Sequence, residues 1–210
     1  MVPITPVKPA QPTPVSAVTL TIKPVSKAAA GVAFYGDSLA YQAQDWLSLR
    51  VHPLYKHAFP GTALCDWLPT MSTDLAKEHP KVVVLAFTGN NMTPCMHQNG
   101  AALTGQALVT KYASDARTAI SVAHSAGAVV VLVRPPVANV PGSKAVIDGW
   151  TLQPGAWLID GGKYAAPHQH FVWTVDGYKV RVPDGIHLAP YGEALYAKAI
   201  ADGLARIGLS

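Results

Sequence analysis

Residues 81–87 read KVVVLAF, and this short stretch decides the class of fold. Three consecutive valines within an otherwise apolar run are typical of a strand that is buried on both faces. Similar runs occur at 31–35 (GVAFY) and at 128–133 (AVVVLV), while apolar residues recur at helical spacing over 39–50 and 103–126. Apolar strands that alternate with helices predict an α/β fold, with a parallel sheet covered on both faces.

Weaker signals extend this pattern in both directions. Residues 52–58 predict a further strand, and a last helix is expected over about 190–207. Gly127 is placed to end the helix over 103–126, because glycine readily adopts the left-handed conformation that closes many helices. We see no internal repeat in the chain.

The interval 134–183 breaks the alternation of strands and helices. Within it, FVWTVDGYKVRV at 171–182 predicts a small hairpin that turns at Asp176-Gly177. His168 and His170 invite interpretation as metal ligands. Two histidines at strand spacing without a third ligand are more often surface or hairpin residues, so we expect no metal site here.

The composition bounds the class of protein. The chain has 210 residues, which fits one domain with a proper core; half of them are hydrophobic and 13% are charged. The net charge of +4 is spread along the sequence without a basic run, which argues against a nucleic-acid-binding protein. No apolar stretch has the roughly 18–20 residues that a membrane span needs. Nothing indicates an obligate oligomer, so a monomer is expected.

The first 27 residues differ from the rest of the chain. Residues 1–27 contain six prolines and show no usable periodicity, which is typical of an extended linker or arm. We therefore place the folded catalytic domain at 28–210. The segment lacks the apolar core of a secretory signal, yet an arm of this composition often precedes a secreted or cell-surface domain. Secretion or surface display is the expectation, with the cytoplasm as the alternative.

Two cysteines, Cys65 and Cys95, leave three interpretations open. They could form a disulfide, which would favour an oxidising compartment, or remain two separate buried thiols. Metal binding is the least favoured, because two cysteines without CxxC spacing make a poor site. Both lie in loops near the candidate functional residues described next.

The segment GDSL at 36–39 follows a predicted buried strand and opens a predicted helix. Ser38 is therefore placed to act as a nucleophile, with its own backbone N–H and the positive end of the helix close to any negative charge that develops. An isolated Gly-Asp-Ser is more often a simple helix cap, so this segment needs support from elsewhere in the chain.

DGIHL at 184–188 supplies a candidate base. With Asp184 three residues before His187, the carboxylate can accept a hydrogen bond from Nδ1–H of the imidazole. Nε2 is then free to take a proton from a serine hydroxyl. The alternative is an ordinary Asp-Gly turn followed by a surface histidine.

Two further segments offer hydrogen-bond donors to an oxyanion. Gly61, within AFPGTA at 58–63, can present a backbone N–H that no side chain obstructs. TGNN at 88–91 follows the strand over 81–87, so that an asparagine amide there would lie at the same edge of the sheet. Each such donor is worth about 100- to 1,000-fold in turnover. Both segments are also ordinary turn sequences.

Taken together, these four blocks resemble the SGNH or GDSL-type esterases and lipases, and in particular actinobacterial members. That family is named for a Ser, a Gly, an Asn and a His in four separated blocks. Here Ser38 falls in the first block, Gly61 in the second, TGNN at 88–91 in the third, and Asp184 with His187 in the last.

The resemblance covers about residues 31–207. It implies a three-layer α/β/α sandwich with a parallel, flavodoxin-like sheet. It also implies acyl-enzyme chemistry at Ser38, with an oxyanion hole formed by the N–H groups of Ser38 and Gly61 and by an asparagine side chain. Chemistry of this kind needs no cofactor and no metal.

One block departs from the family pattern. The third block usually reads G-x-N-D, whereas this chain has TGNNM at 88–92. Aligning the family glycine on Gly89 makes Asn91 the donor and puts a methionine in the place of the acid. Aligning N-D on the two asparagines makes Asn90 the donor and puts Thr88 in the place of the glycine. We favour Asn91, because the glycine sets the turn that aims the amide.

The function expected from these residues is hydrolysis of a carboxylic ester through an acyl-Ser38 intermediate. The substrate would carry a short acyl group, such as acetyl, on a carbohydrate, a lipid or a small molecule. An O-acyltransferase using the same three residues is the first alternative. A non-catalytic carbohydrate-binding or cell-surface module is the second, and the complete Ser, Asp and His set argues against it.

Overall fold

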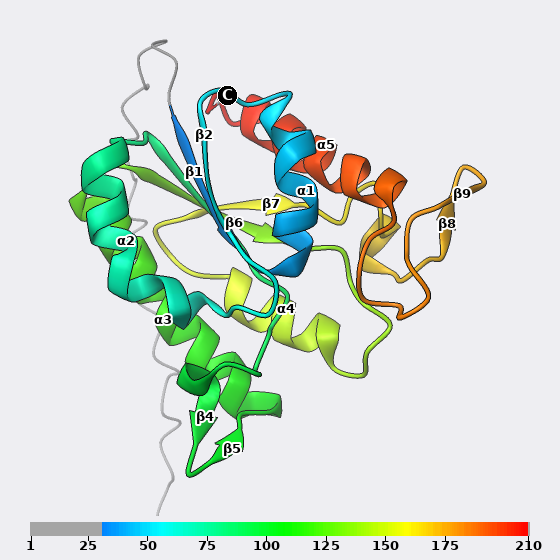
Figure 1. The fold of residues 1–210 in the computed structure, drawn as a ribbon, viewed down its shortest axis with the longest axis horizontal. Helices are drawn as coiled ribbons and strands as arrows, with labels where there is room; N and C mark the ends of the chain where they lie inside the picture. The colour runs from blue at the N-terminus through cyan, green and yellow to red at the C-terminus, as the bar shows by residue number, and fades with distance from the viewer. Residues whose placement is uncertain (1–30, 210) are drawn as a thin grey trace, which may run out of the picture.

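A computed structural model describes residues 31–209 of the protein (Figure 1). The arm predicted over 1–27 and the first residues of the predicted domain lie outside this range. Five strands form one parallel sheet in the order β2-β1-β3-β6-β7. Their bounds are Val32–Gly36 (β1), Leu54–Ala58 (β2), Val82–Ala86 (β3), Val129–Arg134 (β6) and Trp157–Asp160 (β7). Counted within this sheet, the order is 2-1-3-4-5, which is the flavodoxin-like topology.

Helices cover both faces of the sheet, as Figure 1 shows. One face carries α1 (Ser38–Ser48) and α5 (Pro190–Arg206), which lie side by side. The other carries α2 (Leu64–Glu78), α3 (Gly105–Ser125) and α4 (Ser143–Thr151). This arrangement confirms the predicted three-layer α/β/α sandwich.

Alternate residues of the central strands enter two separate cores, which explains the continuous apolar runs. Val32 and Phe34 of β1 pack toward α1 and α5. Ala33 and Tyr35 pack toward α2 and α3. All four are fully buried. A strand with a core on each face has no position left for a polar residue.

The register of the sheet determines where the loops begin. Gly36 at the end of β1 lies opposite Ala58 at the end of β2 and Ala86 at the end of β3. The loops that leave these three strands therefore start side by side at one edge. The connection after β1 runs over one face, through α1, and those after β2 and β3 run over the other, through α2 and α3. A ligand site is common at such a switch point.

The seven elements predicted individually are all present, with ends within two residues of the predicted bounds. The predicted hairpin is formed by β8 (Thr174–Val175) and β9 (Tyr178–Lys179). Asp176 and Gly177, with φ of 51° and 81°, make its tight turn. A two-residue hairpin turn of type I′ requires the left-handed conformation at both of its central residues.

Other elements were not predicted. They are α2, α4, the edge strand β7, and a second hairpin of β4 (His97–Gln98) and β5 (Ala101–Ala102). Helix α2 contains Pro69 and many polar residues, which obscures its helical period. In β7, Trp157 and Leu158 are exposed, so this strand has no continuous buried run. Within residues 31–209, no helix is long and apolar enough to cross a membrane.

Candidate active site

The turn from β1 into α1 presents Ser38 as the first residue of the helix. Asp37 takes the capping role, since its Oδ1 accepts a hydrogen bond from the backbone N–H of Leu39 at 3.1 Å. Ser38 is therefore not used as the cap, and its hydroxyl makes no hydrogen bond to any other residue of the described chain. It lies at the positive end of α1 and keeps 8% of its surface exposed. The hydroxyl is thus free of the helix cap but makes no hydrogen bond to His187, and its role as nucleophile stays a prediction.

Asp37 also fixes the loop that follows β3. Its Oδ2 accepts hydrogen bonds from the backbone N–H and the hydroxyl of Thr88, both at 2.6 Å. The carboxyl group is fully buried. Burial raises the pKa of Asp37, while the hydrogen bonds from Thr88 and Leu39 oppose this rise. The hydroxyl of Thr88, which stands in the place of the family glycine in one alignment, thus contributes a bond that no glycine could make.

Asp184 and His187 form the predicted pair. Nδ1 of His187 lies 2.7 Å from Oδ2 of Asp184. Oδ1 accepts the backbone N–H groups of Ile186 (2.8 Å) and His187 (2.9 Å), so the carboxylate is held by its own loop. Partial desolvation raises the pKa of Asp184, but the hydrogen bonds from the His187 ring and these two N–H groups outweigh it and lower the pKa to about 2. An ionised carboxylate on Nδ1 leaves Nε2 available as a base.

A glutamine connects the helix of Ser38 to the loop of His187. Gln42 lies four residues after Ser38, on the same side of α1. Its Nε2 donates to the carbonyl of Leu188 at 3.0 Å, and its Oε1 accepts the Leu188 N–H at 3.1 Å. Because Leu188 directly follows His187, this contact brings the segment of the predicted base against the first turns of the nucleophile's helix.

An arginine holds the same loop from its other side. Arg181 follows the β8–β9 hairpin and is 2% exposed. Its guanidinium donates to the carbonyls of Ile186 and Val137, the latter at 2.6 Å, and lies over the ring of Phe171. Burial lowers the pKa of Arg181 to about 10, against the opposing charge of Asp184. The guanidinium thus fixes the backbone of the residue before His187.

Sequence reasoning missed three of these residues: Gln42, Thr88 and Arg181. Arg181 had a usable signal, since a charged residue between Val180 and Val182 in a strand-like segment calls for a buried partner. Gln42 had none, because its partner is a backbone group 146 residues away in the chain.

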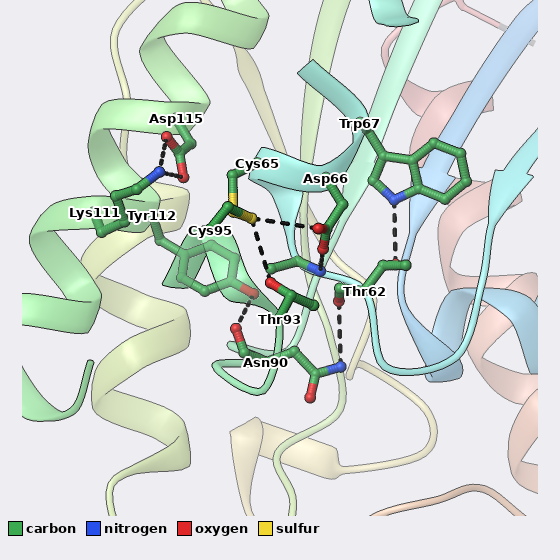
Figure 2. The surroundings of a disulfide bond; sticks show 11 residues. Thr62, Cys65, Asp66, Trp67, Asn90, Thr93, Cys95, Lys111, Tyr112 and Asp115 are labelled. Carbon is green, nitrogen blue, oxygen red and sulfur yellow. Dashed lines mark hydrogen bonds and ion pairs between the residues drawn. A yellow bond between two sulfur atoms is a disulfide. The ribbon is translucent and has the colours of Figure 1, made fainter. Parts of the chain in front are cut away.

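The two asparagines of TGNN lie differently. Nδ2 of Asn90 donates to the carbonyl of Thr62 at 3.2 Å, next to Gly61, as Figure 2 shows. Nδ2 of Asn91 donates to the carbonyl of Leu103 at 2.8 Å. The structure therefore brings the Asn90 amide, rather than that of Asn91, to the loop of Gly61. Of the two alignments that the sequence left open, this geometry favours the one that we had ranked second.

The backbone of this loop shows why position 89 is a glycine. Gly89 has φ of +106°, and a Cβ there would lie 2.7 Å from a methyl group of Val146. The glycine is thus needed for close packing against α4 and for a turn that only glycine adopts readily. Tyr112 fixes Asn90 further, because its hydroxyl donates to the Asn90 carbonyl at 2.8 Å.

Gly61 itself lies in an open position. It has φ of +80°, and no atom lies within 4 Å of the place where a Cβ would be. Its backbone N–H makes no hydrogen bond to another backbone group of the described residues. An unobstructed N–H in the loop that the Asn90 amide contacts is compatible with the predicted anion-binding role of Gly61.

Cys65 and Cys95 are joined by a disulfide bond (Figure 2). The bridge connects the start of α2, just after Gly61, to the segment that follows TGNN. It confirms the first of the three interpretations of these cysteines and rules out the other two. The bridge thus ties together the two loops that carry Gly61 and Asn90.

A groove of about 830 Å³ borders the same loop. Its lining includes residues 88–91, Val109 of α3, Val146 of α4 and Ile186. No charged side chain lines it, and most of its lining is apolar. A groove of this kind accepts an uncharged, apolar part of a ligand.

No family model and no curated protein matches the chain. Solved structures do match it over most of its length. The catalytic domain of peptidoglycan O-acetyltransferase A from Streptococcus pneumoniae is 19% identical, with a TM-score of 0.59 over 85% of this chain and 94% of that one. A GDSL-like lipase from Bacteroides thetaiotaomicron is 14% identical, with a TM-score of 0.59 over 89% and 93% of the two chains.

An acetylxylan esterase from Geobacillus stearothermophilus is 13% identical, with a TM-score of 0.58 over 86% of this chain and 95% of that one. At these identities the likeness concerns the fold. The chain has the fold of the SGNH/GDSL hydrolases, which confirms at this level the resemblance found in its motifs.

Proposed function

We propose that the protein hydrolyses carboxylic esters, with Ser38 as nucleophile, His187 as general base and Asp184 as the orienting acid. The observation that carries this proposal is the Asp184–His187 pair, whose loop is bound through Gln42 to the helix that Ser38 opens. The fold shared with hydrolases, esterases and an acetyltransferase supports acyl transfer as the class of reaction.

The reaction proceeds in two halves. His187 takes the proton of Ser38 as the serine oxygen attacks the ester carbonyl, and returns it to the departing alkoxide. A water molecule then attacks the acyl-serine by the same route. The negative charge on the carbonyl oxygen is stabilised by the N–H groups of Ser38 and Gly61 and, in place of the predicted Asn91, by the amide of Asn90.

The proposed substrate carries a short acyl group on a carbohydrate, a lipid or a small molecule. The uncharged groove of about 830 Å³ is lined by Asn90, the proposed oxyanion donor, although not by Ser38 itself, and it is larger than an acetyl group. A series of acyl lengths therefore belongs in the first experiment. The disulfide supports an oxidising location, outside the cytoplasm.

An O-acyltransferase is the second candidate, because a sugar hydroxyl can take the place of water in the second half-reaction. It is favoured by the likeness to the peptidoglycan O-acetyltransferase domain and by the exposure of the His187 and Asp184 side chains, 40% and 45%, which leaves room for an acceptor.

Hydrolysis of p-nitrophenyl acetate, butyrate and octanoate by the wild type and by Ser38→Ala tests the proposal. Loss of the nucleophile is expected to lower kcat by about 10⁶-fold. If the wild type hydrolyses none of these esters faster than Ser38→Ala, the esterase proposal is wrong. Release of p-nitrophenol that then depends on an added sugar acceptor, with the acyl group recovered on the sugar, would identify the transferase. If the sugar acceptor restores no release, the binding module is left.

A further inference from the structure

Gln42 engages both backbone groups of Leu188, in the way that one strand pairs with another. It donates to the Leu188 carbonyl at 3.0 Å and accepts the Leu188 N–H at 3.1 Å. Leu188 itself is 1% exposed, so its backbone is not free to move into solvent. One amide side chain of α1 therefore fixes both the position and the direction of the chain where it leaves His187.

The amide of Gln42 is held in one orientation. Its second Nε2–H donates to Oε1 of Glu193 at 3.2 Å, in the first turn of α5. The other carboxylate oxygen of Glu193 accepts the indole N–H of Trp46 at 3.2 Å. Since a carboxylate only accepts hydrogen bonds, the nitrogen of the Gln42 amide must face Glu193. The oxygen is then left for the N–H of Leu188.

This contact lies at a position where small errors of geometry matter. Gln42 is one helical turn after Ser38, and Leu188 is one residue after His187. The imidazole is 40% exposed, so packing alone does not fix its ring. A displacement of about 1 Å between reacting groups can cost on the order of 100-fold in rate.

We infer that Gln42 is a positioning residue, which sets the backbone of the His187 segment relative to Ser38 and thereby aligns the base with the nucleophile. The inference rests on the proposed function of these two residues. The hydrogen bonds of Gln42 go to Leu188 and Glu193 and not to Ser38 or His187, so its loss should lower kcat while leaving KM almost unchanged.

The test compares Gln42→Leu, which removes both hydrogen-bonding groups, with Gln42→Glu, which keeps the size but replaces the donor with a second acceptor. Gln44→Leu is the matched control, because Gln44 lies on the same helix and its side chain makes no hydrogen bond within residues 31–209. Steady-state hydrolysis of p-nitrophenyl butyrate, thermal unfolding and hydrogen exchange of the Leu188 amide are measured for each.

Both Gln42 variants should lose about 10- to 100-fold in kcat, with KM within about twofold. The Leu188 amide should exchange faster in Gln42→Leu, which alone removes the acceptor of its N–H. Gln44→Leu should match the wild type in all three measurements. If Gln42→Glu is folded and keeps the wild-type kcat, the inference is overturned, whether or not its Leu188 amide exchanges faster. If instead the wild type is as inactive as Ser38→Ala, it is the proposed function that fails.

Discussion

The two ends of the candidate site are built differently. Asp37 and Ser38 are 0% and 8% exposed and lie at the end of a central strand, between two hydrophobic cores. Asp184 and His187 have side chains that are 45% and 40% exposed, in a loop held by hydrogen bonds from Gln42 and Arg181. The fold fixes the first end, and a few side chains fix the second.

This difference separates two kinds of mutational effect. A change at the buried end disturbs groups on which folding depends, so it should lower the free energy of unfolding. A change at the exposed end disturbs only the loop, so it should lower turnover and leave stability nearly intact.

The sharpest test of the exposed end is Asp184→Asn. The substitution removes the carboxylate that selects the tautomer of His187, and kcat should fall by about 10⁴-fold, equivalent to roughly 5.5 kcal/mol. The hydrogen bonds that lower the pKa of Asp184 lie in a loop whose side chains are nearly half exposed, so the free energy of unfolding should fall by only about 1 kcal/mol. Asp176→Asn, in the exposed turn of the β8–β9 hairpin, is the control and should keep full activity. A large loss of stability in Asp184→Asn, measured by urea unfolding, would contradict the comparison.

Substitution of Asn90 and of Asn91 tests which of them, in the loop that follows β3, is the oxyanion donor. Asn90→Ala should lower kcat by about 100- to 1,000-fold, because the Asn90 amide is the proposed oxyanion donor. Asn91→Ala removes a hydrogen bond to Leu103 and should lower kcat less than tenfold. The reverse order of the two kcat values would restore Asn91 as the donor.

The smallest of these effects is expected at the buried end. Thr88→Val removes one hydrogen bond to the Asp37 carboxylate and should lower the free energy of unfolding by about 1.5–3 kcal/mol, measured by urea unfolding. Thr88→Ser keeps a hydroxyl, so its free energy of unfolding should fall much less. Equal stabilities of the two variants would show that the hydroxyl contributes nothing to this end.

Much of the fold follows from the sequence, because the buried strands carry no polar residue and are read as continuous runs. Ser38 could be singled out because it stands where a buried strand passes into a helix, and Asp184 and His187 because of their three-residue spacing. The helix α2 could not be predicted in this way, since it has an internal proline and a largely polar surface.

The assignment between Asn90 and Asn91 shows a different limit. The sequence indicated that Gly89 sets a turn, and the backbone does turn there. It could not indicate that the turn serves packing against Val146, nor that Thr88 would be fixed by Asp37 from 51 residues away. Both facts depend on neighbours that are distant in the chain. The same applies to Gln42 and Leu188.

The bridge between Cys65 and Cys95 also bears on how the protein is made. Ser38, Gly61 and Asn90 all precede Cys95 in the chain, whereas His187 follows it at a distance. Because synthesis proceeds from the N-terminus, both cysteines and the two loops that they join are translated before the histidine. Wherever an oxidant is present, the loops of Gly61 and Asn90 can thus be joined while the nascent chain still lacks the proposed base, and the proposed hydrolase is complete only when its last segment has been translated.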